Sequence, residues 1–143
     1  MNGRVHLLIE VRDVYEMART IVHDKNHEEI LREIVAELEQ NRQLKGWAII
    51  SQEGLLIEHR MPPSVNPHLL AGNVAALAHS AQVVIGQTDS GPMNTVVIDG
   101  ERKFLILVGG EQQIIFLVMA EHPADLKPLS EFLVDAANRF QSQ

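Results

Sequence analysis

GWAIISQEGLLI, residues 46–57, decides how the rest of this chain is read. The stretch predicts one β-strand, a tight turn at Glu53-Gly54 and a second strand. Ala48-Ile49-Ile50 is continuously apolar, which is typical of a central strand covered on both faces. Gly54 supplies the positive φ that a tight turn needs. The stretch contains no nucleophile–base pair, metal-ligand set or phosphate-binding loop, which favours a binding or regulatory module over an enzyme.

Two helices are predicted before this strand pair. Apolar residues in the first segment, residues 4–22, are spaced by three and four, which favours one amphipathic helix. They are Leu8, Val11, Tyr15, Ala18 and Val22. The strand-like composition of residues 5–11 keeps a strand open as the alternative. Asn26 followed by Glu29 resembles a capping box, so a second helix is predicted over residues 27–43.

An alanine-rich helix is predicted over residues 66–85, from the Asn66-Pro67 start to a stop at Gly86. One apolar face is expected to pack on the sheet and contains Leu70, Val74, Leu77, Ala81 and Val84. The other face would then be exposed and contains Leu69, Gly72, Asn73, Ala76, Ser80 and Val83. Small residues permit close helix–helix approach, and exposed apolar patches mark interfaces. This helix therefore favours self-association over simple burial.

The second half of the chain predicts three strands and a helix. The strands, at 93–98, 102–108 and 113–120, are joined by glycine turns at Asp99-Gly100 and Gly109-Gly110, which predicts an antiparallel meander. Pro123 is expected to open the final helix, over 123–141. The whole order predicts an α/β (α+β) fold, a three-layer α/β/α arrangement with a central five-stranded antiparallel sheet.

Composition narrows the class of protein. The 143 residues suit one compact domain, and 45% of them are hydrophobic, enough for a real core. The net charge of −7, without a basic stripe, argues against nucleic acid or an anionic membrane as partner. There are no cysteines, so a disulfide framework and a thiolate metal site are excluded. No leader segment and no apolar run long enough to span a bilayer is recognised, so the expectation is a cytoplasmic protein without membrane insertion.

Three features that suggest chemistry have simpler interpretations. His23 and His27 are four residues apart, as metal ligands can be, but a helix break is predicted between them and exposed loop histidines are favoured. Residues 88–91, Thr-Asp-Ser-Gly, lack the geometry of a nucleophile loop and are predicted to be a plain connection. Gly109-Gly110 is not followed by a lysine or a helix, so it is predicted to be a turn rather than a phosphate cradle. No catalytic, cofactor or metal residue is predicted.

Several short motifs carry a resemblance to a known family. They are Gly46 at the first strand, Ser51-Gln52-Glu53-Gly54-Leu55 at the hairpin, the alanine-rich helix at 70–81, Val97-Ile98-Asp99-Gly100 at the second hairpin, and Ala124-Asp125-Leu126. With the element order, they make residues 28–143 resemble the roadblock family, named after a dynein light chain. Members more often have Asp before the glycine at the first hairpin, and Asn-Leu-Gly in place of Asp125-Leu126-Lys127. Both departures lie at structural positions.

The resemblance implies a strand order 2-1-5-4-3 and a two-fold homodimer. In such a dimer the edge strand at 93–98 pairs with its copy, and the helix at 66–85 packs against its copy. The interface residues expected are Leu69, Gly72, Asn73, Ala76, Ser80, Val83, Thr95 and Val97.

The resemblance also implies a non-catalytic regulator or scaffold that binds a small Ras-like GTPase, with stimulation of GTP hydrolysis as a further expectation. The alternative is a ligand- or signal-sensing domain of the same layer architecture. Residues 25–143 are assigned to the roadblock-like domain. Residues 1–24 are assigned to an N-terminal extension, expected to be helical and to cover apolar surface.

Overall fold

The computed structural model describes residues 25–109 and 114–141, and its helices and strands follow the predicted order. They are α2 (Lys25–Gln40), β1 (Leu44–Ser51), β2 (Leu56–Arg60), α3 (Pro67–Gln87), β3 (Val96–Asp99), β4 (Lys103–Gly109), β5 (Ile114–Glu121) and α4 (Leu126–Gln141). The predicted N-terminal extension, residues 1–24, and the Gly110 part of the predicted glycine turn lie outside the described residues.

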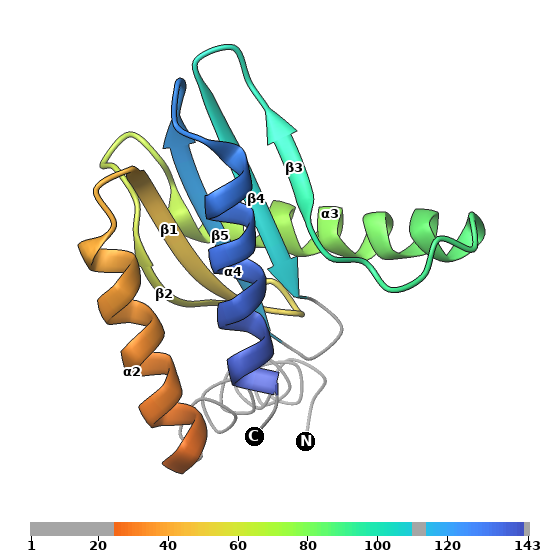
Figure 1. The fold of residues 1–143 in the computed structure, drawn as a ribbon, viewed down its shortest axis with the longest axis horizontal. Helices are drawn as coiled ribbons and strands as arrows, with labels where there is room; N and C mark the ends of the chain where they lie inside the picture. The colour runs from red at the N-terminus through yellow and green to blue at the C-terminus, as the bar shows by residue number, and fades with distance from the viewer. Residues whose placement is uncertain (1–24, 110–113, 142–143) are drawn as a thin grey trace, which may run out of the picture.

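The five strands form one antiparallel sheet in the order β2-β1-β5-β4-β3, which confirms the predicted topology (Figure 1). Ile49 of β1 pairs directly with Phe116 of β5, so the two most apolar strands are neighbours. Almost every residue of these two strands is buried. Continuously buried strands must be covered on both faces of the sheet, and both faces are covered here.

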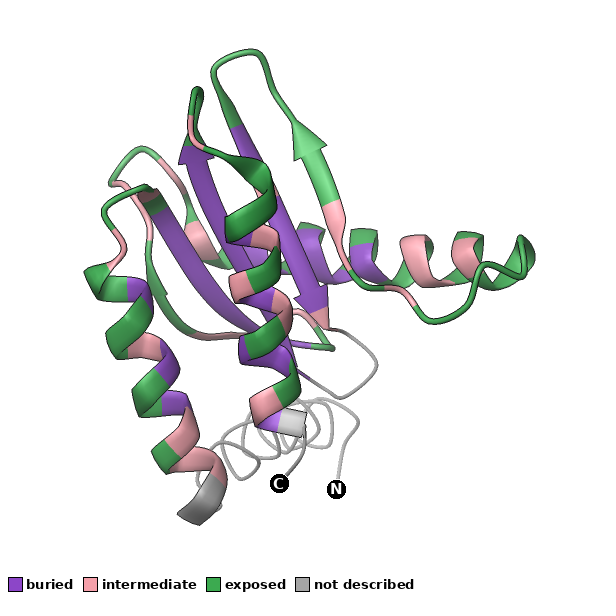
Figure 2. Cartoon of the chain, viewed as in Figure 1, coloured by how far each residue is buried: buried purple, intermediate pink, exposed green. Residues whose placement is uncertain are grey.

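Helices α2 and α4 lie on one face of the sheet and α3 lies on the other (Figures 1 and 2). Between the sheet and the α2/α4 pair, the buried side chains include Ile34, Leu38, Ile49, Phe116 and Leu133. Between the sheet and α3, they include Ile50, Ala71, Val74, Ile115 and Leu117. The predicted three-layer α/β/α architecture is therefore confirmed.

The β1–β2 turn touches α3 through two glycines. Gly54 has a φ of +93°, as the turn prediction requires. The turn is closed by the Ser51 N–H, which donates to the Leu55 carbonyl at 2.8 Å, and by the Leu55 N–H, which donates to Ser51 Oγ at 3.0 Å. A Cβ built on Gly54 would lie 3.2 Å from the Cα of Gly72 on α3. A side chain on Gly54 would therefore be in tight contact with the backbone of α3.

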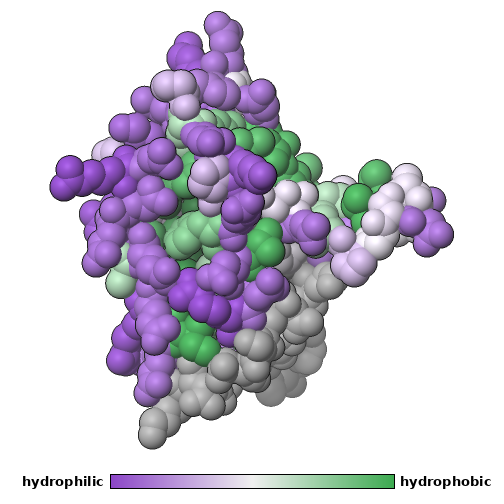
Figure 3. Space-filling view, in the orientation of Figure 1, coloured by the Kyte–Doolittle hydropathy of each residue, from purple (hydrophilic) through white to green (hydrophobic). Residues whose placement is uncertain are grey.

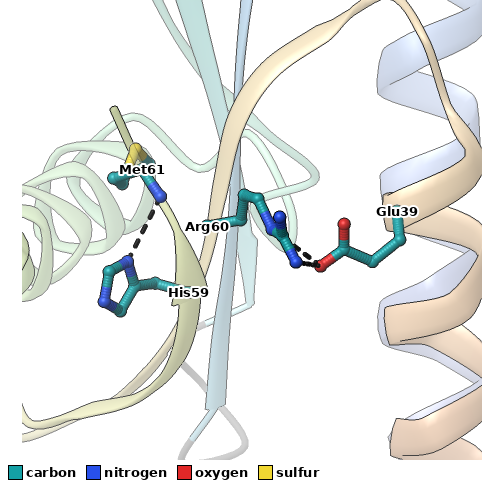
Figure 4. A network of polar contacts seen from close by, with 4 residues as sticks. All are labelled: Glu39, His59, Arg60 and Met61. Carbon is teal, nitrogen blue, oxygen red and sulfur yellow. Dashed lines mark hydrogen bonds and ion pairs between the residues drawn. The ribbon is translucent and has the colours of Figure 1, made fainter. Parts of the chain in front are cut away.

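An ion pair connects strand β2 to helix α2 (Figure 4). Nε of Arg60 donates to Oε1 of Glu39 at 3.0 Å, and Nη2 lies 3.0 Å from the same oxygen. On the neighbouring residues, the Met61 N–H donates to Nδ1 of His59 at 3.2 Å. The strand ends there because the following prolines cannot continue the ladder.

The boundaries of helices α2 and α4 differ from the predictions. Helix α2 already includes Lys25, so it does not begin at an Asn26 cap, and it ends at Gln40 rather than at residue 43. Helix α4 begins at Leu126 rather than at Pro123. The reason at α4 is Asp125, whose Oδ1 accepts the Lys127 N–H at 3.2 Å and so satisfies a free donor of the first turn.

Helix α3 and strand β3 also differ from their predicted lengths. Helix α3 passes through Gly86 and ends at Gln87, because Thr88 donates from both its N–H and its Oγ1 to the Ile85 carbonyl. A single glycine near a helix end costs only about 1 kcal/mol, so it does not end the helix by itself. Strand β3 begins at Val96, three residues later than predicted.

Candidate interface on α3 and β3

Exposed large hydrophobic side chains gather on two elements. Among the described residues, Leu69, Leu77, Val83 and Val84 of α3, Val97 and Ile98 of β3, and Leu126 are exposed. Leu69 is the most open of them, at 65%. All but Leu126 belong to α3 or β3, and Figure 3 shows apolar surface on the arm formed by the far end of α3. Gathered apolar exposure of this kind marks an interaction site.

The face of α3 that packs on the sheet is narrower than predicted. The buried residues are Ala71, Val74, Ala75 and Ala78. Leu70 is half-buried, whereas Leu77 and Val84 are exposed, so the prediction that their stripe is the core face is wrong for these two. Alanine lets the helix axis approach the sheet closely, and the larger leucine and valine are displaced to its flank.

The second half of α3 extends past the edge of the sheet (Figures 1 and 2). Its 21 residues span about 31 Å at the rise of an α-helix. No described residue of the helix after Ala78 is buried. The hydrogen bond from Gln82 Nε2 to the Gly109 carbonyl is long, at 3.4 Å. The far half of the helix therefore presents an apolar surface with little of its own domain beneath it.

All six α3 residues of the predicted interface lie on the exposed face: Leu69, Gly72, Asn73, Ala76, Ser80 and Val83. At 100° per residue this face is opposite the alanines that contact the sheet. Gly72, Ala76 and Ser80 form a stripe of small residues at intervals of four, and a Cβ built on Gly72 would meet no atom within 4 Å. The face is therefore open and shaped for close approach of another helix.

Strand β3 lies at the edge of the sheet and is apolar on both sides. Val97 pairs with Ile106 and Ile98 pairs with Leu105, so Val97 points to the α4 side and Ile98 to the α3 side. They are 41% and 40% exposed. Thr95 of the predicted interface lies just before the strand and is half-buried. An edge strand with exposed apolar residues on both faces is a template for another strand.

Sequence reasoning missed three residues of this surface: Leu77, Val84 and Ile98. The first two were assigned to the core because a helix with apolar residues on nearly every side has no clear periodicity. Ile98 was included in the resemblance only as part of the hairpin. The alternation of strand faces was the signal for it, because neighbouring residues of an exposed edge strand point to opposite faces.

A histidine holds the end of β3 in place. Nε2 of His122 lies 2.9 Å from Oδ1 of Asp99 and 3.1 Å from the Gly100 carbonyl, and its ring contacts that of Phe104. The backbone N–H of His122 also donates to the Arg102 carbonyl at 3.2 Å. The loop between β5 and α4 therefore fixes the β3–β4 turn, and with it the position of the edge strand.

On the face of the sheet opposite α3, Arg139 joins helices α2 and α4. Its Nη1 lies 2.8 Å from Oε2 of Glu37 on α2, and its Nε lies 3.1 Å from Oδ2 of Asp135 on α4. The hydrogen bond with Glu37 raises the pKa of the Arg139 guanidinium, and the nearby charges of Asp135 and Glu33 act in the same direction. The guanidinium is therefore charged throughout the ordinary pH range.

The other polar features give no sign of catalysis or metal binding in the described part of the chain. No group of three or more His, Asp or Glu side chains is placed there to hold a metal ion. His27 lies within α2, is half-buried and stacks on Phe140 with ring centroids 4.6 Å apart, so the prediction of an exposed loop histidine is wrong for this residue. His23 lies outside the described residues. The 88–91 segment is a loop, as predicted, in which Thr88 Oγ1 and Ser90 Oγ are 2.6 Å apart.

One expectation about membranes needs correction. Helix α3 is long and apolar enough to cross a bilayer by length and composition, so the prediction that the chain has no such apolar run is wrong. Within the domain, however, its alanine face packs on the sheet against Leu107, Ile115 and Leu117. Insertion would have to expose that part of the core, so length and composition alone are weak grounds for a membrane span.

Comparisons with known proteins agree with the fold. The sequence profile of the Roadblock/LC7 domain matches residues 30–120. Two uncharacterised proteins of Methanocaldococcus jannaschii are each 26% identical over 89 residues, which covers 62% of this chain and 78% of each relative.

Three solved structures of bacterial proteins have the same fold. MglB of Myxococcus xanthus superposes with a TM-score of 0.68 at 14% identity, covering 78% of this chain and 97% of that protein. A Roadblock/LC7 domain of Streptomyces avermitilis gives 0.65 at 14% identity, with coverages of 76% and 91%. The gliding protein MglB of Thermus thermophilus gives 0.58 at 20% identity, with coverages of 77% and 90%. At such identities the likeness establishes the fold.

Proposed function

This chain belongs to the Roadblock/LC7 domain family, and on that premise we propose that it is a non-catalytic homodimeric regulator or scaffold for a small Ras-like GTPase. The observation that carries the proposal is the exposure of large apolar side chains on α3 and on the edge strand β3. A stable, soluble single domain rarely leaves such a surface uncovered. A second copy of the chain supplies a matching surface, because a two-fold axis brings the same patch from both subunits together.

In the proposed dimer, β3 pairs antiparallel with its copy and extends the sheet. Each α3 then lies against its copy through the Gly72-Ala76-Ser80 stripe, where small residues allow the axes to approach to about 8 Å. Leu69 and Val83 flank this stripe and would be covered. Each large apolar side chain that becomes fully buried contributes about 1.5–3 kcal/mol. Together with the paired strand edges, this favours a tight dimer.

The role beside a GTPase rests on family membership. The resemblance identified from the sequence includes prokaryotic relatives that act with small Ras-like GTPases. Any stimulation of GTP hydrolysis would arise from reshaping the GTPase rather than from an assigned arginine finger. We also propose a cytoplasmic location, as expected of a regulator of a small GTPase.

The test is a pull-down with the full chain as bait, followed by a GTP hydrolysis assay on a captured Ras-like GTPase. The expected result is capture by the wild-type protein and loss or weakening of capture with the monomeric Ala76→Glu variant. Capture of no GTPase by a protein that light scattering shows to be dimeric would reject the GTPase role and leave the dimer standing. A bound small molecule recovered from the purified protein would favour the sensing-domain alternative.

A further inference from the structure

A groove runs along α4 on the side that faces β3. It is lined by α4, the segment that leads into β3 and the end of β4, and its lining includes Asn94, Thr95, Ser130, Glu131, Val134 and Asn138. It has a deeper part of about 150 Å³ and a wider, more open part of about 450 Å³, which share Asn94, Val134 and Asn138. Ser130, Val134 and Asn138 follow one another at intervals of four and form one side of the helix.

The groove exists because two helices cannot cover five strands. Helix α4 packs on β4 and β5. The α4-facing side of β3, which carries Val97, has no helix above it among the described elements (Figure 1). Apolar surface at Val97 and Val134 therefore remains open beside α4.

Dimerisation would turn two such grooves into one trough. If β3 pairs with its copy, the two α4 helices stand roughly four strand spacings apart, which is about 19 Å. Packed helices are separated by about 8–10 Å, so the trough between the two α4 helices admits one additional helix in contact with both. Two helices side by side would not fit.

The charge of the trough indicates which kind of helix would bind there. Glu131 and Asp135 lie along the α4 wall, and among the described residues no lysine or arginine lines the groove. Asp135 is partly engaged by Arg139, whereas Glu131 has no ion pair among the described residues. The two-fold axis repeats these carboxylates on the opposite wall. A helix with basic residues along both flanks and an apolar underside would complement this surface.

We infer that one amphipathic helix of a partner protein, with an apolar face flanked by lysine or arginine, docks in the trough between the two α4 helices of the dimer. This inference rests on the homodimer of the proposed function. The α3 contact of the proposed dimer lies on the opposite face of the sheet and is not part of the trough. The stoichiometry is one helix for two chains.

The test uses the full-length protein and a fluorescein-labelled 18-residue amphipathic peptide with leucine on one face and lysine on both flanks. Fluorescence anisotropy at low salt is expected to show binding, with saturation at one peptide per two chains. The Glu131→Lys variant should weaken binding at least about fivefold through charge reversal at the rim. Asn138→Trp should weaken it at least as much, because the indole fills the groove. Glu58→Lys, the same charge change on the outer strand β2, is the matched control and should bind normally.

Light scattering on the same samples distinguishes a failure of the docking inference from a failure of the proposed dimer. A dimer that fails to bind the peptide, that binds two peptides, or that binds equally well in both groove variants would overturn the docking inference alone. A monomeric wild-type protein would overturn the dimer and the trough together. Equal binding of the same peptide with glutamate in place of lysine would overturn the assigned charge preference and with it the inference.

Discussion

Gly54 and Gly72 lie against each other, with only 3.2 Å between the Cα of Gly72 and the place where a Cβ on Gly54 would stand. One residue is in the β1–β2 turn and the other is on α3. The contact joins the stretch that defines the fold to the helix that carries the candidate interface. A Cβ on Gly54 would press against α3, whereas a Cβ on Gly72 would meet no atom within 4 Å. Alanine is therefore expected to have different effects at the two positions.

Gly54→Ala is expected to destabilise the domain by about 1–3 kcal/mol, because the residue holds a φ of +93° and a methyl group there would lie only 3.2 Å from the Cα of Gly72. Urea unfolding followed by the fluorescence of Trp47, which is buried and is the single tryptophan of the chain, measures the loss. An unfolding midpoint equal to that of the wild type would show that the turn relaxes freely and does not need glycine.

Gly72→Ala should leave the folding of the single domain intact or stabilise it by up to about 1 kcal/mol, because alanine favours a helix and its Cβ meets no atom. The same methyl group should weaken self-association by keeping two α3 helices apart. Sedimentation velocity over a range of concentrations measures the dissociation constant. Unchanged association would place the small-residue stripe away from the contact.

Ala76→Glu is expected to give a folded monomer. The side chain is exposed in the isolated domain but would carry an unpaired charge into the interface, which costs several kcal/mol. Light scattering and circular dichroism report the mass and the fold. Gln43→Glu adds the same charge in the turn after α2 and should remain dimeric; if it dissociates equally, added negative charge rather than the contact is responsible.

Val97→Lys and Ile98→Lys should each raise the dissociation constant of the dimer by at least about tenfold, or 1.4 kcal/mol. Lysine on an edge strand is a common device against strand pairing, and both positions are already open to solvent in one chain. The two residues point to opposite faces of the sheet. If only one variant dissociates, the contact involves one face and the sheet does not continue across the axis.

His122→Ala should release the β3–β4 turn. It removes the contacts from Nε2 to Asp99 and Gly100, which are worth about 1 kcal/mol in total. Hydrogen exchange of the amides at residues 96–100 is expected to accelerate, while β1 and β5 exchange as before. His68→Ala, an exposed histidine on α3, serves as the control. Unchanged exchange at β3 would mean that backbone pairing alone positions the strand.

Arg139→Met should lower the free energy of unfolding by about 0.5–1 kcal/mol, a modest loss because the pairs with Glu37 and Asp135 are partly open to water. The pKa of Arg139 is raised in the folded state, so its contribution is complete at neutral pH and disappears only far into the alkaline range. The difference between variant and wild type should therefore be constant from pH 6 to 9 and shrink in 1 M salt. A difference that varies across this pH window would point to another titrating group.

The strand order followed from local signals in the sequence together with the family resemblance. The apolar run at 48–50 and the glycine turns defined the strands, and the resemblance implied the order 2-1-5-4-3 that the structure has. Helix ends were less accurate because they depend on individual side-chain hydrogen bonds. Asp125 and Thr88 make those bonds, whereas Pro123 and Gly86 were expected to mark the ends.

The rotation of α3 could not be obtained from the sequence. Hydrophobicity alone ranks Leu77 above Ala78 as a core residue, yet Ala78 is buried and Leu77 is not. The choice is made by how closely the helix can approach the sheet, which is a property of the packed structure. The exposed face was nevertheless predicted, because the residues left over after assigning one apolar face were small and uncharged.

The unsupported end of α3 has a consequence for how the protein responds to its own concentration. An isolated helix end with little packing is marginally stable in water, and most helical stability comes from tertiary contacts. Below the dissociation constant of the proposed dimer, the last two turns of α3, whose Val83 and Val84 are already exposed in the single chain, would lose the packing of the second copy and fray. Subunit exchange between dimers would therefore pass through a partly melted helix, which would make exchange slow and strongly dependent on temperature.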